Sequence, residues 1–266
     1  MADAARRLAG TSATPRLDAE LLMAHALGVE RERLLLDPPH GPVPAAFDAL
    51  IARRLAHEPI AYIVGHRAFW TIDLEVGPGV LIPRPDSETL IEAAIAHFGG
   101  RAPKHILDMG VGSGALLLAA LAEWPEATGL GVDQSEAALA IATANAARLG
   151  MADRARIERG SWDAASSGEF DLILCNPPYI EAEADLPPDV ADYEPASALF
   201  AGADGLDEYR LIVPAVRLPA GGVACIEIGC DQGPAVRTLF ELAGYSVQIR
   251  ADLAGRDRCV VAIPRA

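Results

Sequence analysis

The sequence lacks several features that would assign it to a special class of protein. Its 266 residues contain no apolar run near the ~20 residues of a membrane-spanning helix, and residues 1–10 lack the long apolar core of a signal peptide. The four cysteines show no C-x-x-C spacing, and the six histidines show no metal-ligand spacing. We therefore expect a cytoplasmic globular protein with reduced cysteines, no membrane contact and no metal site.

Basic residues are also scarce. The chain has 22 Lys and Arg residues against 37 Asp and Glu residues, which gives a net charge of −15. A protein that holds duplex nucleic acid normally presents a basic surface. We therefore expect no direct nucleic-acid binding. An acidic protein suits a basic partner or a small-molecule substrate instead.

The apolar pattern changes along the chain and predicts three parts. Residues 1–67 carry apolar residues at helical spacing, which predicts a small N-terminal helical domain. Residues 68–83 contain two short apolar stretches around a Gly-Pro-Gly turn at 77–79, which predicts a β-hairpin linker. Residues 84–266 begin with a helix and then alternate strands with helices, as α/β domains do.

The pattern of residues 84–266 predicts a mostly parallel sheet of seven strands. The alternation indicates βαβ units, and the last two strands form an antiparallel pair across a Gly-Arg-Asp turn. The expected strands are 105–108, 129–133, 156–159, 170–175, 222–228, 246–249 and 259–263. The expected helices are 88–98, 115–123, 136–149, 208–217 and 235–243.

A glycine-rich turn follows the first of these strands. Glycines permit a tight turn and a close approach to a ligand, and the next helix supplies amide donors at its start. The G-x-G-x-G spacing differs from the G-x-G-x-x-G of dinucleotide sites. It suits S-adenosylmethionine, whose amino-acid part needs a carboxylate as well as amides; an ordinary strand-to-helix turn is the alternative. The predicted cofactor residues here are Asp108, Gly110, Val111, Gly112, Ser113 and Gly114.

Two further residues favour a nucleoside site beside this turn. Asp133 ends the second strand, where an acid accepts both ribose hydroxyls, although alone it could equally cap the following helix. Trp162 follows the third strand, where its ring either packs on an adenine face or covers the edge of the core. In combination with the glycine turn, the ribose role of Asp133 is favoured.

The most specific motif is Asn176, Pro177, Pro178 and Tyr179, which ends an apolar strand. The prolines lack amide donors and fix φ, so rigid carbonyls lie at the carboxyl end of a strand, where open α/β sheets bind ligands. Asn176 Oδ1 and the Pro177 carbonyl can accept both N–H bonds of an amide or aromatic amine and aim its lone pair at a methyl donor. We expect Asn176 and Pro177 to be catalytic, Pro178 and Tyr179 to contact the substrate, and Asn176 also to border the cofactor.

With these motifs the chain resembles the HemK/PrmC family, the protein-(glutamine-N5) methyltransferases that modify peptide-chain release factors. Further similar stretches are 80–88, 193–195, 202–209 and 226–229. The resemblance implies a class I, Rossmann-like methyltransferase fold and S-adenosyl-L-methionine as methyl donor. It also implies that the acceptor is the side-chain amide nitrogen of the glutamine in a Gly-Gly-Gln motif. Ser161 departs from the family pattern, in which many members have an acid beside the adenine.

The sequence motifs identify the reaction more closely than they identify the substrate. The Asn-Pro-Pro-Tyr motif is shared with adenine-N6 methyltransferases, while the helical domain and the segment around Arg84 favour the glutamine branch. Arg84 either contacts the acceptor or pairs with an acid. Glu194 either faces the substrate or is a solvated loop acid, and the acidic loop 181–192 is either a flap or a plain charged loop. The alternatives are an adenine-N6 methyltransferase, a ribosomal-protein glutamine methyltransferase and a non-catalytic cofactor-binding interaction module.

Overall fold

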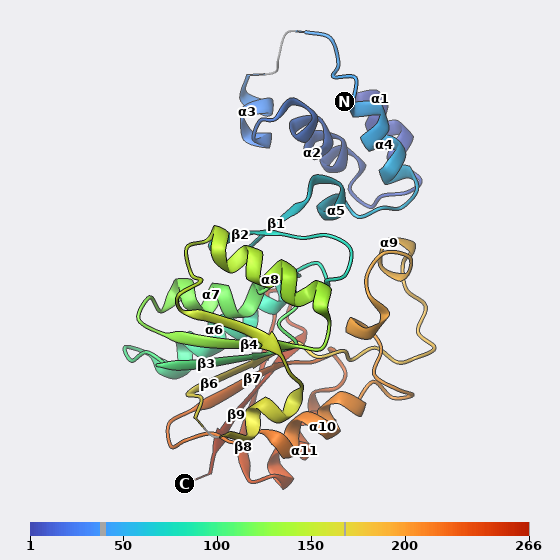
Figure 1. Cartoon of the computed structure of the whole chain (residues 1–266). Helices are drawn as coiled ribbons and strands as arrows, with labels where there is room; N and C mark the ends of the chain where they lie inside the picture. The colour runs from blue at the N-terminus through green and yellow to red at the C-terminus, as the bar shows by residue number, and fades with distance from the viewer. Residues whose placement is uncertain (38–40, 168, 266) are drawn as a thin grey trace. The chain divides into compact units, whose positions relative to one another are not determined.

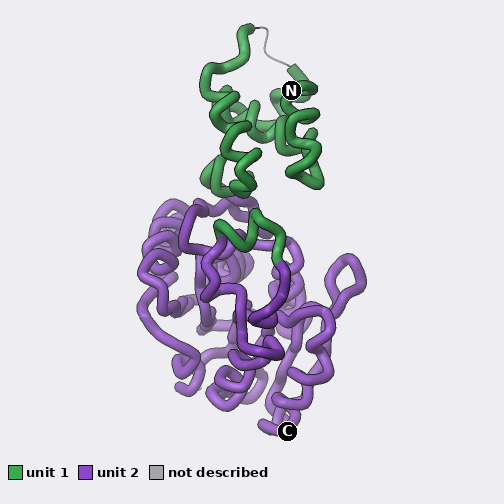
Figure 2. The backbone as a smooth tube through the Cα atoms, turned by 90° about the vertical axis from the view of Figure 1, so that its right-hand side faces the viewer, with its two compact units in different colours: residues 1–66, 186–193 green, residues 67–185, 194–266 purple. Residues whose placement is uncertain are grey.

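The computed structural model describes residues 1–37, 41–167 and 169–265, which form two compact units (Figure 2). The helical unit comprises residues 1–66 together with 186–193. The sheet unit comprises residues 67–185 and 194–266. Residues 186–193 follow the Asn-Pro-Pro-Tyr motif in the chain but group with the N-terminal helices, which the sequence did not indicate.

The helical unit is built from short helices around a small core. The second helix shows the local signals best: it begins with a proline, which needs no amide partner there, and it ends at Gly28 with φ of 64°. Leu8, Leu22 and Ile51 are fully buried between the helices. The helices are α1 (Ala2–Leu8), α2 (Pro15–Leu27), α3 (Arg31–Leu36), α4 (Phe47–Leu55), α5 (Ile60–Val64) and α9 (Pro188–Ala191).

The hairpin lies earlier in the chain than predicted. It pairs β1 (His66–Phe69) with β2 (Ile72–Glu75), and residues 80–82, which were expected to form its second strand, lie outside the strands of the structure. Trp70 makes the turn with φ of 53°, an uncommon conformation for a residue with a side chain. The chain does turn at Pro78 and Gly79, and the Val80 amide donates to the Gly77 carbonyl at 3.4 Å. The prediction of a second strand after this turn was wrong, because that stretch is flanked by Pro78 and Pro83, which cannot donate to a ladder.

The sheet unit contains the predicted seven-stranded, mostly parallel sheet. Its strand order is β5-β4-β3-β6-β7-β9-β8, and only β9 runs antiparallel to its neighbours. The order reverses between β3 and β6, which is where open α/β sheets bind ligands. The strands are β3 (His105–Met109), β4 (Thr128–Asp133), β5 (Ala155–Arg159), β6 (Leu172–Cys175), β7 (Val223–Glu227), β8 (Tyr245–Ala251) and β9 (Asp257–Pro264).

Helices cover both faces of the sheet (Figure 1). One face carries α6 (Glu88–Phe98), α7 (Ala115–Glu123) and α8 (Glu136–Arg148), and the other carries α10 (Asp207–Ala215) and α11 (Gly233–Leu242). The strands β6 and β7 are buried along their whole length, as their continuous apolar runs require. Within the described ranges, no helix is long and apolar enough to cross a bilayer.

Candidate active site

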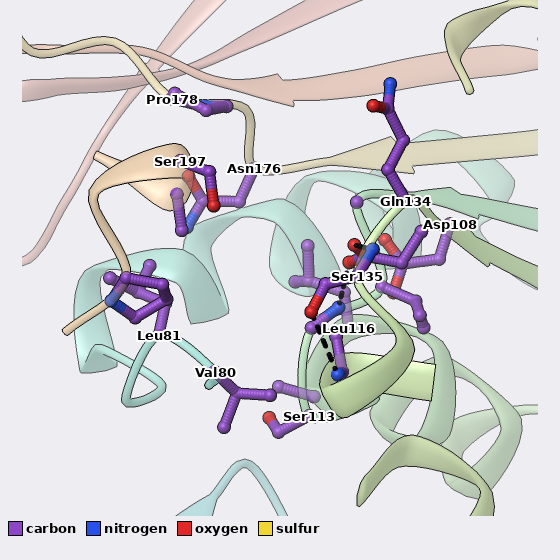
Figure 3. A pocket seen from close by; sticks show the side chains of 18 of the residues that line it. Val80, Leu81, Asp108, Ser113, Leu116, Gln134, Ser135, Asn176, Pro178 and Ser197 are labelled. Atoms are coloured by element: carbon purple, nitrogen blue, oxygen red, sulfur yellow. Dashed lines mark hydrogen bonds between the residues drawn. The ribbon is translucent and has the colours of Figure 1, made fainter. Parts of the chain in front are cut away.

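A cavity of about 400 Å³ in the sheet unit collects most of the predicted site residues (Figure 3). Asp108 near the end of β3 and Asn176 after β6 reach it from neighbouring strands. The predicted residues that line it are Asp108, Gly110, Val111, Gly112, Ser113, Asp133, Trp162, Asn176 and Pro178. Four other predicted residues, all described by the structure, do not line it: Arg84, Gly114, Pro177 and Tyr179.

Asp108 is a buried carboxyl group with one unused oxygen. Its Oδ2 accepts the Leu117 amide at 3.0 Å, whereas its buried Oδ1 has no partner among the described residues. Burial raises the pKa of Asp108 to about 8, the Leu117 amide lowers it, and the nearby charge of Asp133 raises it. A cationic group in the cavity would complete the bonding of Oδ1 and favour the ionised carboxylate.

The glycine turn is held in shape by its own hydrogen bonds. The amides of Gly110 and Val111 both donate to the Val132 carbonyl at 2.9 Å, and the amide of Gly114 donates to the Val111 carbonyl at 2.7 Å. Gly110 has φ of 73°, and a Cβ there would lie 3.4 Å from the Trp162 ring. These bonds hold the turn as a fixed part of the cavity wall.

Asp133 braces the turn and leaves the capping of α8 to another residue. Its Oδ2 accepts the Gly112 amide at 3.0 Å, and its Oδ1 accepts the Ser135 amide at 2.9 Å. Ser135 is the N-cap, because its hydroxyl accepts the Ala138 amide at 3.3 Å. Each Asp133 oxygen keeps a lone-pair direction for a further donor, and the residue lines the cavity.

Trp162 is fixed by a residue that the sequence did not single out. It opens a short 3₁₀ helix over Trp162–Ser167, and its Nε1 donates to Glu208 Oε2 at 2.6 Å. Glu208 stands in the first turn of α10 and also lines the cavity. The bond holds the indole beside Gly110, so the ring forms a flat wall of the cavity. A long-range pair of this kind leaves no local sequence signal.

The amide of Asn176 is oriented by Ser87. Asn176 Nδ2 donates to Ser87 Oγ at 3.2 Å, and both residues line the cavity. Because the amide nitrogen is used in this contact, Oδ1 is the end that remains available as an acceptor. Ser87 lies in a 3₁₀ turn over Pro85–Ser87 directly before α6, and it is buried.

The rest of the Asn-Pro-Pro-Tyr turn is held from behind. Gln232 Nε2 donates to the Tyr179 carbonyl at 2.9 Å, and the Tyr179 hydroxyl donates to Glu227 Oε1 at 3.2 Å. Burial is the main cause that raises the pKa of Tyr179, so the hydroxyl stays a donor. Gln232 and Glu227 were not predicted to act at the site.

Arg84 pairs with an acid. Its guanidinium donates to Glu194 Oε1, and Glu194 Oε2 accepts the Ile82 amide at 2.9 Å. Glu194 is buried rather than solvated. Of the two readings that the sequence left open for Arg84, the ion pair is the one that the structure shows, and this pair joins the chain before α6 to the loop after β6.

The fold and the cavity define a class I methyltransferase. The sequence profile of the methyltransferase small domain matches residues 86–192. A solved methyltransferase from Pyrococcus furiosus has the same fold: it covers 79% of this chain and 95% of its own, with a TM-score of 0.54 at 18% identity. The protein is an S-adenosylmethionine-dependent methyltransferase, as the sequence predicted.

The family of the protein follows from its N-terminal helical domain and from relatives that are similar over most of the chain. The profile of the PrmC N-terminal domain matches residues 1–65. The release factor glutamine methyltransferase of Rhodospirillum rubrum is 46% identical over 95% of this chain and 80% of its own length. That of Cereibacter sphaeroides is 46% identical over 92% of this chain and 90% of its own. The chain belongs to the release factor glutamine methyltransferase family, and the predicted resemblance is confirmed.

Proposed function

We propose that the protein methylates the side-chain amide nitrogen of the glutamine in the Gly-Gly-Gln motif of a peptide-chain release factor. The observation that carries this proposal is the Asn176 amide: Ser87 holds its nitrogen, which leaves its oxygen as an acceptor, and the residue lines the same cavity as Asp108 and Asp133. The family to which the chain belongs supports the acceptor. The net charge of −15 favours a protein acceptor over duplex DNA.

The residues around the cavity fit S-adenosylmethionine. The unpartnered Asp108 Oδ1 suits its ammonium group, the Asp133 carboxylate suits its ribose hydroxyls, and the Trp162 face suits its adenine. When bound, S-adenosylmethionine supplies an electrophilic methyl group. Gly110 lets the Trp162 ring lie close to the backbone of the turn, since a Cβ there would be 3.4 Å from the ring.

The chain's own residues make a poor nucleophile reactive by positioning it. The lone pair of an amide nitrogen is delocalised, so the nitrogen must be held with that lone pair directed at the methyl carbon. Asn176 Oδ1 and the Pro177 carbonyl accept its two N–H bonds, which fix the angle of approach and stabilise the positive charge that develops on nitrogen. The rigid proline ring and the Ser87 bond keep both acceptors in place, so little reorganisation is needed during transfer.

A substrate panel tests this function. The full-length protein is incubated with S-adenosylmethionine carrying a labelled methyl group, and a bacterial release factor, ribosomal proteins and duplex DNA are offered side by side. We expect label in the release factor, lost when the glutamine of its Gly-Gly-Gln motif is replaced by alanine. Label in the DNA or in a ribosomal protein alone would overturn the proposed acceptor. We infer that the reaction takes place in the cytoplasm, in keeping with the four free cysteines.

A further inference from the structure

The amide group of an acceptor glutamine carries three polar atoms or bonds, and the proposed reaction gives partners to two of them. Its two N–H bonds meet Asn176 Oδ1 and the Pro177 carbonyl, whereas its carbonyl oxygen has no donor assigned to it. A carbonyl oxygen that leaves water without gaining a donor is costly. The site therefore calls for a hydrogen-bond donor on the side of the cavity that holds Asn176.

Ser197 presents a hydroxyl group on that side of the cavity. The residue lines the cavity, and Figure 3 shows it beside Asn176 and Pro178, with Asp108 on the opposite side. The Ser197 hydroxyl has no hydrogen-bond partner among the described residues. A serine hydroxyl can donate one proton, so this group is free to serve a ligand.

The other side-chain donors around the cavity are engaged or lie with the cofactor residues. Ser87 holds Asn176 Nδ2, which is the opposite end of that amide from the oxygen assigned to the substrate. Trp162 Nε1 is already bonded to Glu208. The donors that belong to the glycine turn or follow β4 and β5, next to Asp108 or Asp133, are Ser113, Gln134, Ser135 and Ser161.

The segment 194–201, which carries Ser197, is fixed at its start by an acid. Glu194 Oε2 accepts the Ile82 amide at 2.9 Å, and its Oε1 accepts the Arg84 guanidinium. Glu194 is buried, so both contacts are shielded from water. They tie the start of the segment to the chain before α6.

The same segment is fixed at its end by the chain that leaves the Asn-Pro-Pro-Tyr motif. The Ile180 amide donates to the Leu199 carbonyl at 2.9 Å, and the Ala201 amide donates to the Ile180 carbonyl at 2.8 Å. Between the two attachments, a 3₁₀ turn over Ala196–Ala198 carries Ser197. The hydroxyl is therefore held at the cavity by a segment that is attached on both sides of it.

We infer that Ser197 binds the acceptor glutamine: its hydroxyl donates to the side-chain carbonyl oxygen while Asn176 and Pro177 hold the nitrogen. The inference rests on the proposed function, since it takes a side-chain amide as the acceptor. The three contacts together satisfy the carbonyl oxygen and both N–H bonds of a primary amide. They therefore recognise the amide as a whole and not its nitrogen alone.

A neutral hydroxyl suits this oxygen better than a cationic group. The lone pair of the amide nitrogen is delocalised onto the carbonyl oxygen, and it must return to nitrogen to attack the methyl carbon. The oxygen loses negative charge as the reaction proceeds, so a strong donor there would stabilise the ground state more than the transition state. The contribution of Ser197 therefore lies in binding the acceptor and not in the transfer step.

Substitutions of Ser197 in the full-length protein test the inference. Ser197→Ala removes the donor, so the KM for the release factor should rise about threefold to tenfold, the size of one neutral hydrogen bond. The kcat should change less than about threefold, because the contact is not strengthened in the transition state. The affinity for S-adenosylmethionine, measured by calorimetry, should match that of the wild type.

A pair of variants of equal size separates the hydroxyl from the shape of the side chain. Ser197→Thr keeps a hydroxyl and should keep a KM near that of the wild type, whereas Ser197→Val has the shape of threonine and should behave as Ser197→Ala does. Ser246→Ala is the matched control. Ser246 is an exposed serine of β8 outside the cavity, and its hydroxyl also has no partner among the described residues. This variant should leave KM and kcat unchanged.

A double-mutant cycle tests the contact itself. Calorimetry measures how the release factor binds to protein saturated with S-adenosylhomocysteine, which carries no methyl group to transfer. The wild type and Ser197→Ala are each titrated with the native release factor and with one whose Gly-Gly-Gln glutamine is replaced by alanine. Ser197→Ala should weaken binding of the native factor about threefold to tenfold and leave binding of the alanine factor unchanged, because that factor lacks the carbonyl.

The outcomes keep this inference apart from the proposed function. An unchanged KM in Ser197→Ala, or equal losses of affinity for both release factors, would overturn the role of Ser197 while the wild type still labels the release factor. If the wild type labels a ribosomal protein instead, the proposed function fails, and the same cycle on the glutamine of that protein decides the role of Ser197. Label in DNA alone would overturn both, since the acceptor is then not a side-chain amide.

Discussion

Asp108 places a carboxyl group where an ammonium group can complete its bonding, and its pKa of about 8 ties cofactor binding to pH. Below pH 8 the free protein holds Asp108 largely protonated, and a bound cation favours the ionised form. Binding therefore releases a proton, and the affinity for S-adenosylmethionine should rise with pH until about 8. Calorimetry between pH 6.5 and 8.5 checks this expectation.

The Asp108→Asn variant is the control for that measurement. It should bind S-adenosylmethionine on the order of tenfold more weakly at pH 8. The variant loses the attraction between the carboxylate and the ammonium group, and about 1.4 kcal/mol of binding free energy corresponds to a tenfold change in affinity. Its affinity should lack the rise that Asp108 causes, while any titration of the ligand itself affects both proteins alike. A wild-type affinity that does not differ from the variant's in its pH dependence would contradict the assignment.

Asn176 should separate binding from chemistry. In Asn176→Ala the acceptor nitrogen loses one of its two acceptors, so transfer to the release factor should fall by about 100-fold or more. S-adenosylmethionine affinity should fall by less than about tenfold, because Asp108, Asp133 and Trp162 stay in place. Single-turnover transfer and calorimetry on the same preparation measure the two effects. Near-normal turnover would remove Asn176 from the reaction.

Glu227 makes stability depend on pH in a defined direction. Its pKa is raised from its ordinary value near 4.5 to about 7, so between these values the unfolded chain ionises while the folded protein holds the proton. Folding stability is therefore lost as pH rises from about 4.5 to 7, by roughly 3 kcal/mol at about 1.4 kcal/mol per pKa unit. Urea unfolding at pH 5 and pH 8 should show Glu227→Gln gaining on the wild type only at the higher pH. An equal difference at both values would argue against a raised pKa.

At the residue scale, the sequence could predict what is local and could not predict what is paired over distance. Asp108, Asp133 and Asn176 follow strands at fixed spacing, so their place at one edge of the sheet could be deduced. Ser87 and Glu208 reach the same cavity from segments 89 and 46 residues away from their partners. No local pattern encodes such a pair, and only the fold brings its members together.

The strand β4 packs so closely against the glycine turn that one added methyl group should lower the stability of the protein. Gly131 in β4 faces the glycine turn, and a Cβ there would lie 2.6 Å from Val111 Cγ2 and 3.0 Å from Leu117 Cδ2. Gly131→Ala should destabilise the protein by about 1–3 kcal/mol. Because Val111 lines the cavity, the variant should also weaken S-adenosylmethionine binding. Thermal unfolding and calorimetry measure both effects.

Gly100→Ala is the matched control for this substitution. A Cβ at Gly100 would meet no heavy atom within 4 Å, so its stability and cofactor affinity should match those of the wild type. Equal unfolding midpoints for the two alanine variants would mean that β4 and the glycine turn have room to move apart.

At the element scale, the bounds of a helix or strand were predicted correctly where turn or capping residues mark its ends in the sequence. The helices 88–98 and 115–123 have the predicted bounds, because a glycine ends the first and a glycine turn begins the second. The hairpin was misplaced because Gly77-Pro78-Gly79 is a stronger turn signal than Trp70, whose positive φ has no signature in sequence. The strand β2 that follows Trp70 alternates, and it buries Ile72 and Leu74.

At the scale of the whole molecule, the chain crosses between the units more than once. Residues 186–193 leave the sheet unit and join the helical unit, where Asp189 lies 3.5 Å from Arg54 and the Tyr193 hydroxyl donates to the Ala56 carbonyl at 2.7 Å. The loop that follows the Asn-Pro-Pro-Tyr motif is therefore partly built into the helical unit. The sequence predicted a charged loop or a flap at 181–192 and held no sign of this pairing.

Arg54 holds this part of the helical unit together, and it provides a test of what the unit does. The guanidinium is buried with Asp18 at 2.9 Å and also donates to the carbonyls of His57 and Glu58. Arg54→Met leaves Asp18 buried without its partner, at a cost of about 3–5 kcal/mol to the helical unit. If that unit binds the release factor, the KM for the release factor should rise about tenfold or more while S-adenosylmethionine affinity in the sheet unit stays unchanged.

The paired variant and an exposed control make the result interpretable. Asp18→Asn together with Arg54→Met removes the uncompensated charge and should recover part of the lost KM. Arg6→Met breaks only the exposed pair with Asp3, so it should change neither stability nor KM measurably. An unchanged KM in a visibly destabilised Arg54→Met protein would show that the helical unit does not recognise the substrate. Loss of cofactor affinity in the same variant would instead show that the sheet unit depends on the helical unit for its own stability.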